Sequence, residues 1–191
     1  VESRKYHYNI EYAKCVPLLE KAIALDPEFA MAYRALAYAY YSLADLTRSK
    51  IFRKKALDLS GRLSDRERYI IQGEISFWNA PEKDWNKAIE AFNKALELYP
   101  DDSMVNYELG SIYKALEEWD KAIQYLEVCR KNKYKFLAAY AHLADCYRAK
   151  GRYDRAEEVL EYCIENISDS ASTHLWMADN YLAQAKVDSA S

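Results

Sequence analysis

A column of small side chains recurs along this sequence at a nearly fixed interval. Its members are Ala22, Ala56, Ala95, Cys129 and Cys163. Successive members lie roughly 34 residues apart, with one longer step between Ala56 and Ala95. Because a fixed period over most of a chain is typical of a repeat architecture, the sequence predicts stacked copies of one supersecondary unit.

Three further columns run in step with the first. The second small column is Cys15, Ser49, Ala88, Ala122 and Ala156, the large column is Tyr12, Leu46, Trp85, Trp119 and Tyr153, and the tyrosine column is Tyr6, Tyr40, Tyr113, Tyr147 and Tyr181. In 119–129 the apolar residues recur with the spacing of one helix face. Each unit therefore reads as two helices, a first helix such as 103–116 and a second helix such as 119–129. Small side chains are expected where two helices approach to about 8–10 Å.

Proline, turn and capping residues between the columns predict where the helices begin and end. Pro27 and Pro100 follow the ends of two second helices, as prolines commonly do. Gly151, and Glu117 with Glu118 in the preceding unit, mark tight turns between the two helices of a unit. The stretches 64–67 ("SDRE") and 154–157 ("DRAE") are similar to capping boxes at helix starts.

Composition favours an all-α fold and gives no signal for nucleic acid or membrane. The chain has 51% apolar residues but only four glycines and four prolines, so it has few of the residues that favour β-hairpin turns. The net charge is −3, and no apolar run approaches the ~20 residues of a membrane span. The four cysteines contain no CxxC pair, and we expect them to act as small apolar spacers in a reducing, cytoplasmic compartment. The chain opens on Val1 and no signal segment is evident there, so an upstream segment is expected to be missing.

No pattern of catalytic, cofactor-binding or metal-binding residues emerges. The four glycines stand far apart, which argues against a phosphate-binding loop. The three histidines, at 7, 142 and 174, have no metal-ligand spacing. Carboxylates are abundant, but they fall on helix faces expected to be solvated. We therefore expect a non-catalytic protein with no cofactor and no metal site.

The helix pairs resemble the tetratricopeptide repeat (TPR). The segments "NYELGSIY" (106–113) and "YAHLADCY" (140–147) match the first half of that motif, and "KAIEAFNKALELYP" (87–100) matches its second half. Gly61, Tyr134 and Ser168 replace the closing proline of the motif, whereas Asn106 and His174 replace its first aromatic residue. The resemblance implies a right-handed superhelical solenoid over 1–191.

The repeat boundaries follow from the columns. We expect a partial unit at 1–28, full units at 29–61, 62–101, 102–135 and 136–169, and a terminal helix at 170–186. The unit at 62–101 has five extra residues, placed around 78–84 where Pro81 marks a turn. The segment 56–75 resembles a linking repeat of bacterial TPR arrays attached to signalling proteins such as kinases and transcription regulators.

The family resemblance implies a protein-interaction module whose first helices line a concave groove for an extended or helical partner segment. Carried over position by position, the groove residues are Arg34, Tyr38, Tyr41, Tyr107, Ser111, Lys114, Ala141, Asp145, Arg148, Leu175, Asp179 and Leu182. Tyrosine and arginine often make interface hot spots, and the tyrosine column does not use Tyr38, Tyr41 or Tyr107. The alternative is that these are ordinary surface residues. A lysine–asparagine clamp for a C-terminal carboxylate is absent, so a chaperone tail is not the expected ligand.

Two other surfaces have alternative interpretations. Leu175, Trp176 and Leu182 on the terminal helix indicate either that the native protein continues or that the chain self-associates there. The basic segment 48–68 fits an acidic or phosphorylated partner, but acidic residues dilute it. We favour a solvated outer helix face for that segment.

Overall fold

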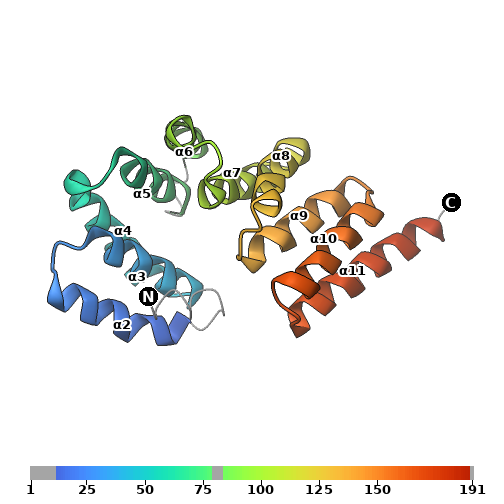
Figure 1. Cartoon of the computed structure of the whole chain (residues 1–191), viewed down its shortest axis with the longest axis horizontal. Helices are drawn as coiled ribbons and strands as arrows, with labels where there is room; N and C mark the ends of the chain where they lie inside the picture. The colour runs from blue at the N-terminus through green and yellow to red at the C-terminus, as the bar shows by residue number, and fades with distance from the viewer. Residues whose placement is uncertain (1–11, 79–83, 190–191) are drawn as a thin grey trace. The chain divides into compact units, whose positions relative to one another are not determined.

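Every element that the structure describes is a helix, which confirms the predicted all-α fold. The computed structural model describes residues 12–78 and 84–189 (Figure 1). Tyr6, His7, Pro81 and most of the first expected helix fall outside these residues. The elements are α2 (Tyr12–Leu25), α3 (Ala30–Ser42), α4 (Leu46–Asp58), the 3-10 helix η1 (Ser60–Arg62), α5 (Asp65–Trp78), α6 (Trp85–Leu98), α7 (Ser103–Ala115), α8 (Trp119–Lys131), α9 (Leu137–Ala149), α10 (Tyr153–Asn166) and α11 (Ala171–Asp188).

The helices belong to two compact units, residues 1–100 and residues 101–191. In the first unit α3 packs on α2 and on α4, and α5 packs on α6. In the second unit each helix from α7 to α11 packs on the next, and α9 also contacts α7 and α11. The pairs α3–α4, α5–α6, α7–α8 and α9–α10 are consecutive helix pairs, the arrangement that the repeat columns predict.

The small columns lie where the paired helices touch. Every member of the second small column is buried, with exposed fractions of 0–1%. Gly110 shows how close the approach is, because a Cβ atom there would lie 2.6 Å from Leu126 Cγ. A Cβ atom on Gly73 would likewise lie 2.6 Å from Phe92 Cε1. Adding side-chain volume at such contacts costs about 1–3 kcal/mol.

The four cysteines are buried spacers, as predicted. All four are free thiols. Burial raises the pKa of the Cys129 thiol to about 12, and it raises those of Cys146 and Cys163 to about 11. A thiol with so high a pKa is almost entirely protonated at neutral pH and is a poor nucleophile.

Most of the predicted helix limits are confirmed, and one is wrong. α2 and α6 end two residues before Pro27 and Pro100. Ser64 and Glu67 form the predicted capping box, in which Ser64 Oγ accepts from the Glu67 N–H and the Glu67 carboxylate accepts from the Ser64 N–H. Asp154 does not cap a helix, since α10 already begins at Tyr153 and no side chain caps its first turn.

Three turns between a first and a second helix share one left-handed residue. The φ angles are 60° at Ala44, 59° at Glu117 and 67° at Gly151. The turns predicted at Glu117 and Gly151 are therefore confirmed, and Ala44 lies at the matching place between α3 and α4. Of the three, only the glycine adopts this conformation without steric cost.

Candidate functional site

The predicted groove residues fall into three columns on the first helices α3, α7, α9 and α11. Column one is Arg34, Tyr107, Ala141 and Leu175; column two is Tyr38, Ser111, Asp145 and Asp179; column three is Tyr41, Lys114, Arg148 and Leu182. Each column contains residues of both compact units.

In the first unit, Arg34 forms an ion pair that was not predicted from the sequence. Its Nε donates to both carboxylate oxygens of Glu74 on α5, at 3.0 and 2.9 Å. Both side chains are largely buried. The pair therefore joins the first helix of one repeat to that of the next.

The place of Glu74 in the repeat follows from the glycine before it. Gly73 meets Phe92 as Gly110 meets Leu126, so the two glycines occupy equivalent positions on α5 and α7. Glu74 follows Gly73 as the column-two residue Ser111 follows Gly110. Glu74 is therefore the column-two residue of α5.

The column residues Tyr38 and Tyr41 both pack against other aromatic rings in the first unit. The ring of Tyr41 meets the ring of Trp78 edge-on at 4.5 Å between centroids, and that of Tyr38 meets Tyr12 at 5.8 Å. The guanidinium of Arg53 lies 5.4 Å from the Tyr41 ring centroid and is itself buried. A solvated position was expected for the basic segment 48–68, and for Arg53 that expectation is wrong.

In the second unit, Tyr107 is a packed residue rather than a free surface residue. Only 6% of it is exposed. Its ring meets Phe136 edge-on at 4.8 Å and stacks on the imidazole of His142 at 5.5 Å. Packing therefore accounts for Tyr107, contrary to the interpretation made from the sequence. Ala141 is buried as well, and its side chain contributes no polar group to this face.

Ser111 links α7 to α9 and determines which ring nitrogen of His142 carries the proton. Ser111 Oγ lies 2.8 Å from the carbonyl oxygen of Tyr107 and 3.1 Å from His142 Nδ1. Because the hydroxyl proton is donated to the carbonyl, Oγ must accept from Nδ1–H. The Nε2 atom of the neutral ring is then an acceptor. Burial, with a smaller contribution from Lys114, lowers the pKa of His142 to about 4, so the ring is neutral at pH 7.

Asp145 is shared by two cations at the same interface. Lys114 Nζ on α7 lies 2.6 Å from Asp145 Oδ2, and Arg148 Nη2 pairs with Asp145 Oδ1. Arg148 Nη1 also lies 3.4 Å from the carbonyl oxygen of Trp176 on α11. Lys114 and Asp145 keep 26% and 32% of their side-chain surface exposed, so solvent reaches this ion-pair network.

On α11 the same three columns are open to solvent. Leu175 is 65% exposed and Leu182 is 60% exposed. Asp179 is also exposed, and within the described part of the chain it has no hydrogen bond or ion pair. The opposite face of α11 is buried, with Asn180 Nδ2 donating to the Tyr153 carbonyl oxygen at 3.1 Å. Trp176, which was grouped with the two leucines from the sequence, is half-buried.

The described part of the chain offers neither a metal centre nor a membrane span. Among residues 12–78 and 84–189, no group of three or more His, Cys, Asp or Glu residues could hold a metal ion. Within the same residues, no helix has the length and apolar character needed to cross a membrane.

Comparison with known proteins identifies the same helical repeat. Two family models described as tetratricopeptide repeat match the chain, one at residues 82–144 and the other at residues 139–168. Residues 82–168 belong to the tetratricopeptide-repeat family. No curated protein matches the TPR chain.

Solved structures share the fold at low sequence identity. A thermophilic TPR protein from Thermus thermophilus is 18% identical with a TM-score of 0.74, and the match covers 94% of this chain and 95% of that one. A chain of the APC/C hetero-tetramer Cut9–Hcn1 is 19% identical with a TM-score of 0.67, covering 94% of this chain and 35% of that one. YrrB, described as a TPR protein with an unusual peptide-binding site, is 17% identical with a TM-score of 0.52, covering 93% and 87%. These likenesses concern the fold.

Proposed function

We propose that this TPR protein binds an extended or helical segment of a partner protein through column residues of its first helices. The TPR fold points to a protein-interaction module, and the finer proposal concerns where and how the partner binds. The observation that carries it is the network around Asp145, in which charged groups of two first helices are held in fixed positions and remain partly exposed.

The chemistry of this network suits a polypeptide. Lys114 and Arg148 supply donors, and Asp145 supplies acceptors. A peptide backbone offers one donor and one acceptor per residue, so it can engage both kinds of group. Because the network is already ordered by its own contacts, less conformational entropy is lost when a partner binds.

The aromatic cluster of the first unit is proposed as a second, more apolar contact. Tyr38 and Tyr41 are half-buried, and each rests edge-on against another aromatic ring. Rigid, partly exposed tyrosines supply contact area at low entropic cost. YrrB, which shares the fold, is described as having a peptide-binding site, and this supports peptide binding by the present chain.

The proposal is tested by selecting peptides from a display library of random ~12-residue segments. Selected peptides are then measured by fluorescence anisotropy against the wild type and a Lys114→Ala/Asp145→Ala variant. We expect that variant to lose at least about tenfold in affinity. The matched control is Arg155→Ala/Glu158→Ala, which removes an exposed i,i+3 pair from the second helix α10 and is expected to change affinity by less than about twofold. Equal losses in both variants, or no selected peptide, would contradict the proposal.

Self-association through α11 is the second candidate, and the exposure of Leu175 and Leu182 favours it. Light scattering coupled to size exclusion tests it. A wild-type oligomer that a Leu175→Glu/Leu182→Glu variant abolishes would support self-association, whereas a monomer would exclude it.

The cellular setting is a separate inference. We propose that this TPR segment serves as a scaffold in a bacterial regulatory protein, in the cytoplasm. The support is the resemblance of 56–75 to linking repeats, together with the fold shared with the protein from Thermus thermophilus.

A further inference from the structure

The exposed face of α11 occupies the positions through which the other first helices of its unit contact a neighbouring first helix. On α7, the column residues Tyr107, Ser111 and Lys114 all contact residues of α9. On α9, the column-three residue Arg148 reaches the backbone of α11. On α11, these columns contain Leu175, Asp179 and Leu182, and all three side chains are exposed. By the geometry of the repeat, this is a helix-contacting face.

Charge pairing along column two indicates what kind of helix would fit. Glu74 pairs with Arg34 of α3, and Asp145 pairs with Lys114 of α7, so each carboxylate receives a cation from another first helix. Asp179 is the column-two carboxylate of α11. Arg148 precedes Asp179 by the same interval as Lys114 precedes Asp145, but its guanidinium bonds Asp145 and the Trp176 carbonyl instead.

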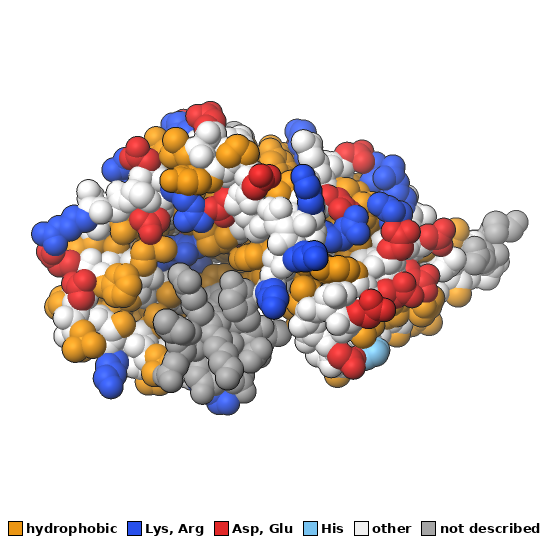
Figure 2. Space-filling model, viewed as in Figure 1, with side chains coloured by type: hydrophobic (Ala, Val, Ile, Leu, Met, Phe, Trp, Pro, Cys, Tyr) orange, Lys and Arg blue, Asp and Glu red, His pale blue; other side chains and the backbone are white. Residues whose placement is uncertain are grey.

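The segment of the chain that contains Asp179 is strongly acidic. Residues 153–189 contain eight Asp and Glu residues against two Lys and Arg residues, although the whole chain carries a net charge of only −3. Figure 2 shows red carboxylate side chains gathered over the end of the second unit formed by α10 and α11. A clustered negative potential attracts cationic partners and disfavours anionic ones.

We propose that the face formed by Leu175, Asp179 and Leu182 binds a basic amphipathic helix of a partner protein. A lysine or arginine of that helix pairs with Asp179, and apolar side chains three or four positions away on either side cover Leu175 and Leu182. This inference rests on the proposed function, because it assumes that the TPR chain binds a polypeptide. It concerns the column residues of α11, none of which belongs to the Asp145 network.

A designed peptide tests the pairing directly. The probe is a fluorescein-labelled amphipathic helix of ~15 residues with two leucines seven positions apart and a lysine between them, compared with a peptide in which glutamate replaces the lysine. We expect the lysine peptide to bind the wild-type chain saturably, and binding to weaken as salt rises. Asp179→Asn should weaken it about tenfold, and Leu175→Ala/Leu182→Ala by at least that factor.

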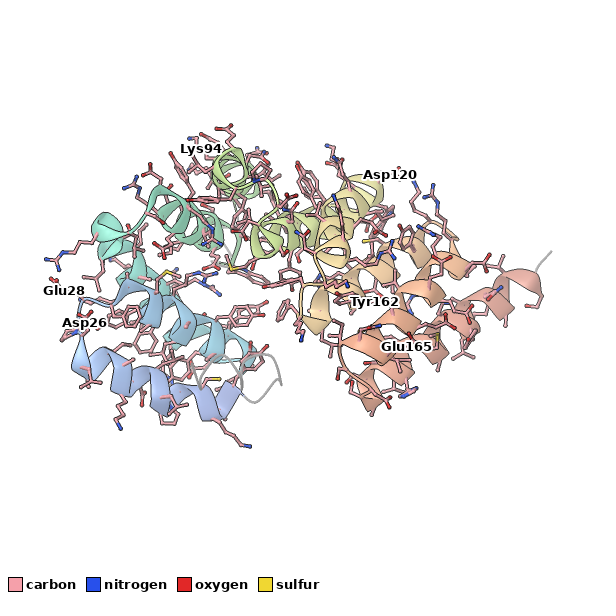
Figure 3. The ribbon with its side chains drawn as sticks, in the orientation of Figure 1. Asp26, Glu28, Lys94, Asp120, Tyr162 and Glu165 are labelled. Atoms are coloured by element: carbon pink, nitrogen blue, oxygen red, sulfur yellow. The ribbon has the colours of Figure 1, made fainter. Side chains whose placement is uncertain are left out.

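The matched control is Glu165→Gln, which removes one exposed carboxylate of the same acidic region from α10 (Figure 3). It should change the affinity by less than about twofold. The charge-exchanged variant Asp179→Lys should bind the glutamate peptide in preference to the lysine peptide. Circular dichroism melts of all variants check that the fold is retained.

Three results would overturn the inference. The first is a lysine peptide that does not bind, and the second is an equal loss in Asp179→Asn and Glu165→Gln, since that would indicate only general attraction to acidic surface. The third is a wild-type oligomer, measured by sedimentation velocity, that Leu175→Glu/Leu182→Glu abolishes, because a second copy would then cover this face. Library peptides that depend on Lys114 and Asp145 are measured separately, so the proposed function can survive each of these results.

Discussion

Glu74 in the first unit and Asp145 in the second occupy the same column of the repeat, but the two carboxylates lie in different environments. The side chain of Glu74 is 8% exposed and is held by Arg34, whereas that of Asp145 is 32% exposed and is shared by Lys114 and Arg148. Residue type alone does not distinguish these positions. Burial assigns Glu74 mainly to holding α3 and α5 together, and it leaves Asp145 available to solvent and to a partner.

The residues of column three also differ between the two units. In the first unit Tyr41 occupies this column and packs on the ring of Trp78. In the second unit Lys114 and Arg148 occupy it, and long cationic side chains keep their charged ends in water. Tyr41 is therefore held by aromatic packing, whereas the charged ends of Lys114 and Arg148 remain partly exposed.

Removing each carboxylate in turn gives the largest expected effect. Glu74→Ala leaves the Arg34 guanidinium largely buried without its carboxylate partner, and we expect a loss of about 3 kcal/mol in the free energy of unfolding. Asp145→Ala removes a partly exposed carboxylate, and the expected loss is below about 1 kcal/mol. Urea unfolding followed by circular dichroism measures both changes.

A double variant separates the ion pair from the packing around it. Arg34→Met/Glu74→Met removes both charges, so it should cost less than Glu74→Ala alone. If Glu74→Ala and Asp145→Ala destabilise the protein equally, burial does not distinguish the two members of column two.

The turns that end the first helices offer a second, smaller comparison between the units. Ala44 in the first unit and Gly151 in the second both have positive φ angles, of 60° and 67°. We expect Gly151→Ala to lower the free energy of unfolding by about 1 kcal/mol, because a Cβ atom disfavours this conformation. We expect Ala44→Gly to raise it by up to about 1 kcal/mol, since relief of strain exceeds the added freedom of the unfolded chain. Thermal melts that move in the same direction for both variants would contradict this account.

The sequence predicts the helix pairs well because the features that define them are local or periodic. The small columns mark the contacts between helices, and the turn at Gly151 and the capping box at Ser64 depend only on neighbouring residues. Asp154 shows the limit of such motifs. The letters "DRAE" fit a capping box, but α10 begins one residue earlier, at Tyr153, and Asp154 therefore lies inside the helix.

The candidate site is less predictable because it depends on contacts between distant residues. Glu74 was missed because the apolar residues of α5 fit several registers, and the contact of Gly73 with Phe92 decides among them. Tyr107 has the same residue type as Tyr38, yet it is buried because Phe136 and His142 close over it from the next repeat. The glycine before Glu74 was the one sequence signal that could have set the register, by analogy with the glycine of α7.

The smallest expected effect concerns pH, and it comes from His142 of the second unit, which is packed between helices. The pKa of His142 is lowered from 6.5 to about 4, chiefly by burial and further by Lys114, while Asp145 opposes the shift. Between these two values the unfolded chain binds more protons than the folded one, so stability should fall as pH falls below about 6.5.

The expected loss in the free energy of unfolding between pH 7 and pH 6 is on the order of 1 kcal/mol or less. Thermal melts at the two pH values should differ less in His142→Gln than in the wild type. An unchanged pH dependence in His142→Gln would mean that the neutral ring bonded to Ser111 is not what couples protonation to folding.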